Sequence, residues 1–251
     1  MNRFFSAPIL RATARERGRT WLVLFIAVFL MLVATTRSTA DAWGAEAFSG
    51  LFAGLWWQLL ILLLGGGLLA DEVESGHAQL VLLRPLTRAQ WVGGRFLGAA
   101  AVLCAVGTLS WAVSLVAAML RGGSGELVGR LAVLPLALLP ALGWLATLTA
   151  VSAVVRGWTN AGLVVAARVG WLLLSWGVPA AMKSDQVRRA IELLTPFIGP
   201  QDIMPLARQL QNGEPLQPWG LLWDLAWIAA AWLVAVQLFR RQELARRRAG
   251  G

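Results

Sequence analysis

The chain has 251 residues, of which 58% are hydrophobic and 14% charged, and its formal net charge is +9. Soluble domains contain about 45–50% apolar residues, so this composition argues against an ordinary soluble domain and favours a membrane protein. The positive charge does not indicate nucleic-acid binding, because the arginines stand mainly at the ends of apolar runs, where topology signals and contacts with anionic lipid head groups are expected.

The first twenty residues, 1–20, predict an amphipathic helix that lies on the inner surface of the membrane. Arg11, Arg15 and Arg19 are spaced four residues apart and therefore share one helical face. Apolar side chains near the start, such as Phe4 and Ile9, would anchor this helix to lipid. We expect it to precede a membrane domain that covers residues 21–251.

Six apolar runs follow, each close to the ~20 residues that cross a bilayer as a helix. We predict six transmembrane helices at 21–36, 51–70, 96–120, 131–155, 158–182 and 219–239. Six spans place both termini on one side, and the segments on that side carry more arginine than those on the other. By the positive-inside rule both termini are cytoplasmic. The predicted fold class is therefore all-α, a polytopic membrane protein.

Glycine and tryptophan within the runs bear on helix packing. The triplet 65–67 is all glycine, which permits a close approach by another helix or a local kink. Five tryptophans near predicted run ends indicate an aromatic belt at the membrane surfaces: Trp21, Trp43, Trp91, Trp158 and Trp219.

Two charged residues fall inside predicted spans, where a charge is costly without a partner or a wet cavity. Arg168 lies about ten residues, or ~15 Å, from the cytoplasmic end of the fifth run. Asp224 lies nearer the outer end of the sixth run, so a direct ion pair would require the spans to slide or tilt. We interpret Arg168 and Asp224 as candidate translocation-pathway residues. The alternative is that Arg168 binds backbone carbonyls of the fourth run.

Several kinds of catalytic or cofactor site are excluded by the residue types present. The only lysine, Lys183, follows no glycine-rich loop, so the phosphate-binding G-x-x-x-x-G-K-[ST] motif is missing. The only histidine is His77 and the only cysteine is Cys104, so no His/Cys metal cluster or disulfide can form within the chain. We therefore predict no catalytic, cofactor-binding or metal-binding residues and no enzyme activity.

A polar stretch from Asp71 to Arg95 interrupts the apolar runs between the second and third predicted spans. It begins with acidic residues and a glycine, continues as a short leucine-rich turn at 78–83, and ends in basic residues that lead into the third span. With the termini inside, this stretch is cytoplasmic and is available to a soluble partner.

This stretch resembles the first cytoplasmic loop of the permease subunits of ABC-2-type transporters, which commonly read E-x-E-x-G-T, a leucine-rich turn, P-x-[ST]-R and then a basic residue. The matching residues are Glu72, Glu74 and Gly76 in the opening, Leu80, Leu82 and Leu83 in the turn, and Pro85, Thr87 and Arg88 in the P-x-[ST]-R piece. Arg95 stands at the basic position, whereas His77 departs from the usual threonine.

The resemblance implies a permease subunit of an exporter in the cytoplasmic (inner) membrane, without an ATPase of its own. ATP and Mg would be bound by separate cytoplasmic ABC ATPase subunits, and the short helix between spans two and three would couple them to the membrane domain. A second permease chain would complete the transporter, with a homodimer favoured over a heterodimer.

Three other interpretations remain open at this point. One is a permease of the same class that serves a specialised maturation pathway. Another is a membrane anchor or scaffold with no transport role. The third, an intramembrane enzyme, would need acidic residues clustered at one depth, which the sequence does not have.

Overall fold

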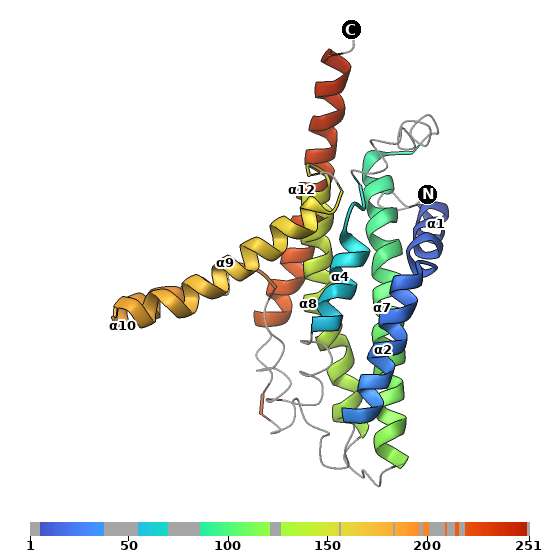
Figure 1. The fold of residues 1–251 in the computed structure, drawn as a ribbon. Helices are drawn as coiled ribbons and strands as arrows, with labels where there is room; N and C mark the ends of the chain where they lie inside the picture. The colour runs from blue at the N-terminus through green and yellow to red at the C-terminus, as the bar shows by residue number, and fades with distance from the viewer. Residues whose placement is uncertain are drawn as a thin grey trace.

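The computed structural model describes residues 6–37, 55–69, 86–120, 127–155, 157–182, 184–195, 198–200, 209, 214–215 and 219–249 of the chain. Within these residues the regular elements are all α-helices, arranged as a bundle with one projecting arm (Figure 1). The helices are α1 (Ala7–Gly18), α2 (Trp21–Arg37), α4 (Leu55–Gly65), α7 (Arg88–Leu120), α8 (Leu127–Ser152), α9 (Thr159–Met182), α10 (Asp185–Leu194) and α12 (Trp219–Ala249).

The helices follow the predicted apolar runs, with differences at the ends. α2 and α9 agree with the predicted spans to within one residue at each end. α7 begins at Arg88 rather than at residue 96, and α12 continues to Ala249 rather than ending at residue 239. Hydropathy locates the part of a helix that lies in lipid, whereas the helix itself continues into polar sequence wherever its backbone remains hydrogen-bonded.

By length and apolarity, three of the described helical segments can cross a membrane: Arg88–Ala117, Thr159–Met182 and Trp219–Arg241. Two shorter apolar helical segments, Trp56–Gly65 and Leu138–Ser152, lie beside them. Part of the second predicted span, residues 51–54 and 70, falls outside the described residues. The chain is thus an all-helical protein with several membrane-compatible helices.

The core of the bundle lies where α4, α7 and α8 meet. Leu64, Leu103 and Leu145 are fully buried there, one from each helix. A Cβ atom built on Gly65 would lie 2.7 Å from Cβ of Leu148, a distance that real side chains do not adopt. The first glycine of the triplet therefore allows a close approach of α4 to α8, which is one of the two roles that the sequence left open for the triplet. Close packing at small residues contributes to helix association in lipid, because the hydrophobic effect does not drive apolar helices together there.

α9 departs from this bundle. Figure 1 shows it projecting sideways, with α10 at its far end. Only 6% of its most apolar window is buried within the protein, against 39% for the window of α7. Its buried residues, Asn160, Ala161 and Val164, all belong to its first two turns. The helix is therefore attached to the bundle by its N-terminal end, while most of its apolar surface is uncovered.

The end of α4, the start of α7, α1 and the C-terminal part of α12 lie at the same end of the molecule (Figure 1). Both described termini lie there too.

Candidate functional site

Most of the predicted docking residues lie outside the described residues: Glu72, Glu74, Gly76, Leu80, Leu82, Leu83 and Pro85. Thr87 and Arg88 are described, at the start of α7. The structure does describe how the two ends of this segment are held. We call these holding contacts the loop base, and they involve Arg17, Gly65–Leu69, Thr87, Gln90, Trp91, Asn160 and Phe239.

A reciprocal pair of hydrogen bonds starts α7 at the end of the loop. The backbone N–H of Thr87 donates to Oε1 of Gln90 at 2.9 Å, and the backbone N–H of Gln90 donates to Oγ1 of Thr87 at 3.2 Å. This is a capping box, which satisfies N–H groups that have no partner within the helix. The threonine of the P-x-[ST]-R piece thus has a local structural role. Gln90 was not singled out in the sequence, although the T-x-x-Q spacing was visible.

The C-terminal end of α4, where the loop begins, is bound by an arginine from α1. Nη1 of Arg17 donates to the carbonyl oxygen of Gly66 at 3.1 Å and to that of Leu63 at 3.4 Å. Gly67 has φ of +61°, the left-handed conformation in which helices commonly end. The last carbonyls of a helix carry partial negative charge, so a cation placed there stabilises this end.

Asn160 binds the same end of α4 from α9. Its Nδ2 donates to the carbonyl oxygen of Gly65 at 3.3 Å, and its Oδ1 accepts from the backbone N–H of Gly67 at 3.4 Å. Oδ1 also accepts from the N–H of Ala161 at 2.7 Å. Because the Asn160 side chain is fully buried, these bonds replace the water that it would otherwise bind. One side chain thereby joins the start of α9 to the start of the loop.

An apolar cluster joins both ends of the loop to α8 and α12. Leu69 and Trp91, on either side of the segment, are both buried in it, and the Trp91 ring stacks on Phe239 of α12 with ring centroids 4.8 Å apart. Ala150 of α8 and Ala153, which directly follows α8, complete the contact. The prediction that Trp91 belongs to an exposed aromatic belt is therefore wrong, since the ring is 1% exposed.

Helix α1 is fastened to α7 beside the loop base. A Cβ on Gly94 would lie 2.9 Å from Ile9, and one on Gly98 would lie 2.6 Å from Thr13, so this G-x-x-x-G pair seats α1 directly on the α7 backbone. Arg95, between the two glycines, donates to Oε2 of Glu16 at 2.8 Å. Arg95 thus joins two helices, a role that its position before the third span did not indicate.

The two charged residues predicted inside spans lie in different surroundings. Nη1 of Arg168 donates to Oε1 of Gln58 in α4 at 2.6 Å, and its guanidinium group lies 4.7 Å from the Trp144 ring of α8. Asp224 is 4% exposed on α12. Trp227, three residues after Asp224, donates from Nε1 to Oγ1 of Thr147 at 2.8 Å, so this face of α12 packs on α8. The Trp144 ring is thus a contact of Arg168 with the fourth run.

The loop base consists of contacts between helix ends. Among the residues that the structure describes, no three His, Cys, Asp or Glu side chains lie together in a way that could hold a metal ion. The contacts of the loop base are hydrogen bonds and ring stacking that connect the end of α4 and the start of α7 to α1, α9 and α12.

Comparison with known protein families matches residues 12–244 to the family described as ABC-2 family transporter protein. The matched range contains every residue of the loop base, from Arg17 in α1 to Phe239 in α12. The comparison with curated proteins gives no match.

Proposed function

The chain belongs to the family of ABC-2 transporter proteins, and on this premise we propose that it is the transmembrane permease subunit of an ABC exporter. Its substrate crosses the membrane by alternating access, driven by ATP hydrolysis in separate cytoplasmic subunits. Those subunits hold ATP and Mg, since the sequence of this chain has no G-x-x-x-x-G-K-[ST] motif and the residues that the structure describes form no metal-ligand cluster.

The loop base is the observation that carries this proposal. A rigid-body movement of a docked ATPase is useful only if the docking loop is firmly attached to the spans that must move. Here the loop ends are bound by Arg17 of α1, Asn160 of α9 and Phe239 of α12, in addition to α4 and α7 themselves. Side chains from across the bundle thus converge on a single short segment.

We further propose that Glu72 and Glu74 dock the ATPase, by pairing with basic groups on its surface, and that the leucine-rich turn fits into an apolar groove beside them. Short-range attraction between opposite charges would set the orientation of docking. The firmly held loop ends would then pass the movement on to α4 and α7.

The proposed topology has six spans with both termini in the cytoplasm and α1 on the inner membrane surface. The three long apolar segments, and the arrangement of both termini at one end of the bundle, support this topology. Arg11, Arg15 and Arg19 are all exposed on α1, where they can contact anionic head groups.

A second permease chain completes the proposed transporter, and we favour an identical one, with one ATPase subunit bound to each copy. The long uncovered surface of α9 supports an assembly larger than one chain, since it offers apolar side chains from Leu163 to Met182 to a partner or to lipid.

Co-purification from native membranes tests the proposal. The wild-type chain, extracted in mild detergent, should retain an ATP-binding subunit, and Glu72→Arg/Glu74→Arg should lose it. The matched control is Asp185→Arg/Glu192→Arg, which reverses two exposed carboxylates on α10, far from the loop base. Recovery of the ATPase by all three proteins would show that docking does not depend on Glu72 and Glu74. Recovery by none would contradict the permease and favour an anchor or scaffold.

A further inference from the structure

Helix α12 continues past the part of it that can cross a membrane. The membrane-compatible segment ends at Arg241, whereas the helix ends at Ala249. At ~1.5 Å per residue, residues 242–249 add about 12 Å to the length of the helix. The head-group layer on one side of a bilayer is only about 5–8 Å thick. An upright α12 therefore carries its last turn through the head groups and into the water beyond them.

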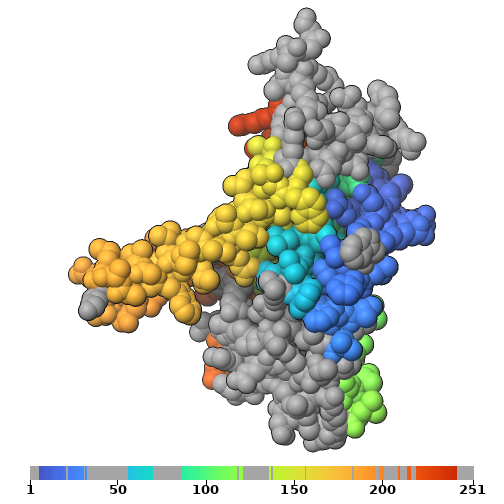
Figure 2. All heavy atoms as spheres, in the orientation of Figure 1, coloured from blue at the N-terminus to red at the C-terminus, as the bar shows by residue number. Residues whose placement is uncertain are grey.

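This C-terminal extension, residues 240–249, leaves the bundle at the loop base. Phe239 is buried there with its ring stacked on Trp91, and the next two residues, Arg240 and Arg241, are both exposed. Figure 1 shows the extension standing beyond the ends of the neighbouring helices. In Figure 2 the red atoms of α12 reach the molecular surface at the same end. The extension thus projects from the end of the molecule at which the docking loop is held.

The C-terminal extension is strongly basic. It reads RRQELARRRA, with five arginines against one glutamate, so its formal charge is +4. Two other arginines near this end have partners inside the bundle, since Arg17 binds the end of α4 and Arg95 pairs with Glu16. The helix of the extension carries its charge away from the bundle instead. Such a concentration of positive charge attracts an anionic partner.

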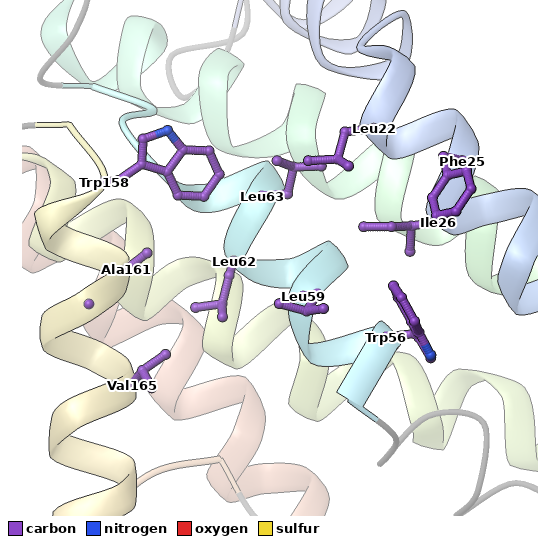
Figure 3. Close-up of a pocket in the computed structure, with 11 residues that line it drawn as sticks. Leu22, Phe25, Ile26, Trp56, Leu59, Leu62, Leu63, Trp158, Ala161 and Val165 are labelled. Carbon is purple, nitrogen blue, oxygen red and sulfur yellow. The ribbon is translucent and has the colours of Figure 1, made fainter.

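The described sides of the bundle have a different character. A cavity of about 410 Å³ lies between α2, α4 and α9, and every residue that lines it is apolar or glycine, as Leu62, Trp158 and Val165 illustrate in Figure 3. Further along α9, large apolar side chains such as Leu173 and Trp176 are exposed. These surfaces suit lipid or another membrane chain. A soluble anionic partner would meet the molecule at its end, where the C-terminal extension projects.

We propose that the C-terminal extension is a second docking element for the ATPase subunit, and that it binds an acidic surface on that subunit. This docking role rests on the permease function proposed above. The loop base connects the two elements, because Phe239 directly precedes the extension and stacks on Trp91, just after the docking loop. One subunit seated on the loop is therefore within reach of the extension.

Two contacts of opposite charge determine how the subunit can bind. The loop presents Glu72 and Glu74, whereas the C-terminal extension presents arginines. A matching subunit has to offer a basic surface to the first and an acidic surface to the second. A subunit in another orientation, or one that serves a different transporter, would bring like charges together. The extension therefore contributes to the choice of partner as well as to affinity.

The affinity of the ATPase subunit for the full chain tests this role. The ATP-binding subunit that co-purifies with the wild type is separated and then titrated back onto the chain in phosphatidylcholine nanodiscs, which have no net charge. Arg247→Glu/Arg248→Glu should weaken binding about tenfold at low salt, because attraction between exposed charges is replaced by repulsion. The difference should disappear at about 1 M salt, where the screening length falls to about 3 Å.

Two matched variants separate the effect of charge from other effects of substitution. Arg188→Glu/Arg189→Glu reverses an adjacent pair of exposed arginines on α10 and should bind the subunit as the wild type does. Arg247→Lys/Arg248→Lys retains the positive charge of the extension and should also bind normally.

Three results would contradict this account at different points. Equal affinity of the wild type and Arg247→Glu/Arg248→Glu would overturn the docking role and leave the permease function standing. A loss of affinity that appears only in nanodiscs containing phosphatidylglycerol would overturn it too, because the extension would then bind lipid head groups. Absence of any ATP-binding subunit from the purified wild type would contradict the permease function and, with it, the second docking element.

Discussion

The loop base and the outer part of α9 are built in opposite ways. At the loop base, buried polar side chains such as Asn160 bind helix ends, and rings such as Trp91 stack between helices. Along α9 beyond Val164, large apolar side chains such as Leu173 and Trp176 are exposed. The first region is fixed by contacts within one chain, whereas the second gains its surroundings from lipid or another chain. Substitutions should therefore be costly in the first region and tolerated in the second.

The largest difference in stability is expected between substitutions of two glycines, Gly98 and Gly170. Gly98→Leu should destabilise the fold strongly, by about 1–3 kcal/mol or more, because its Cβ would lie 2.8 Å from the backbone carbonyl oxygen of Leu10, which cannot move aside easily. Gly170→Leu, in the open part of α9, should be neutral or stabilising. Thermal unfolding in mild detergent, followed by tryptophan fluorescence, measures both. Equal melting temperatures would contradict the seating of α1 on α7.

A polar pair on α9 makes the same comparison within one helix. Asn160→Leu should lower stability by about 1–3 kcal/mol, because the buried carbonyl of Gly65 and N–H of Gly67 lose a partner. Ser175→Ala removes an exposed hydroxyl that binds only the carbonyl of Leu172 and should change stability by less than about 0.5 kcal/mol. The same melting experiment measures both variants. An Asn160→Leu protein as stable as Ser175→Ala would contradict the stabilising role of Asn160 at the end of α4.

Two helix N-caps give a smaller effect. Thr87→Ala should cost about 1 kcal/mol, because the capping box of α7 loses the Oγ1 acceptor, whereas Thr87→Ser should retain it. Ser184, the N-cap of α10, makes no side-chain capping bond, so Ser184→Ala should leave stability unchanged. Hydrogen exchange at the first turn of each helix reports the local change. If Thr87→Ala and Ser184→Ala changed the exchange at their helices equally, the Thr87–Gln90 bonds would not hold this end of the loop.

The smallest effect is expected for the exposed ion pair of α10. Arg188→Gln breaks contacts with Asp185 and Glu192 on a solvated surface and should change stability by about 0–0.5 kcal/mol. Glu16→Gln should cost more, because it removes the negative charge that pairs with the largely buried Arg95. Melting curves that ranked the two in the reverse order would contradict a structural role for Arg95.

The sequence predicted the helices better than their contacts. Apolar runs located α2 and α9 almost to the residue, because hydrophobicity over some twenty residues is a strong signal. The start of α7 was misplaced, since the apolar run begins at Phe96 while the helix begins where Thr87 and Gln90 cap it. Arg11, Arg15 and Arg19, which the spacing assigned to one helical face, are all exposed on α1.

The tertiary partners of single residues were beyond sequence reasoning. The G-x-x-x-G pair at Gly94 and Gly98 could have indicated a close helix contact, but not that α1 would fill it. Nothing in the spacing of Arg17 connects it to Gly66, because periodicity describes the face of one helix and not the helix opposite. Arg168 likewise meets Gln58 and Trp144, which come from two other helices. The docking residues Glu72 to Pro85 remain a prediction.

The most direct test of the central claim, that the loop base passes movement of the ATPase into the bundle, is ATP hydrolysis by the purified complex in nanodiscs. Arg17→Met removes the cation from the end of α4, and Arg188→Met on α10 serves as the control. We expect Arg17→Met to retain the ATPase subunit in normal amount while hydrolysis falls to the rate of the isolated subunit, and the control to match the wild type. Wild-type hydrolysis by Arg17→Met would contradict the claim.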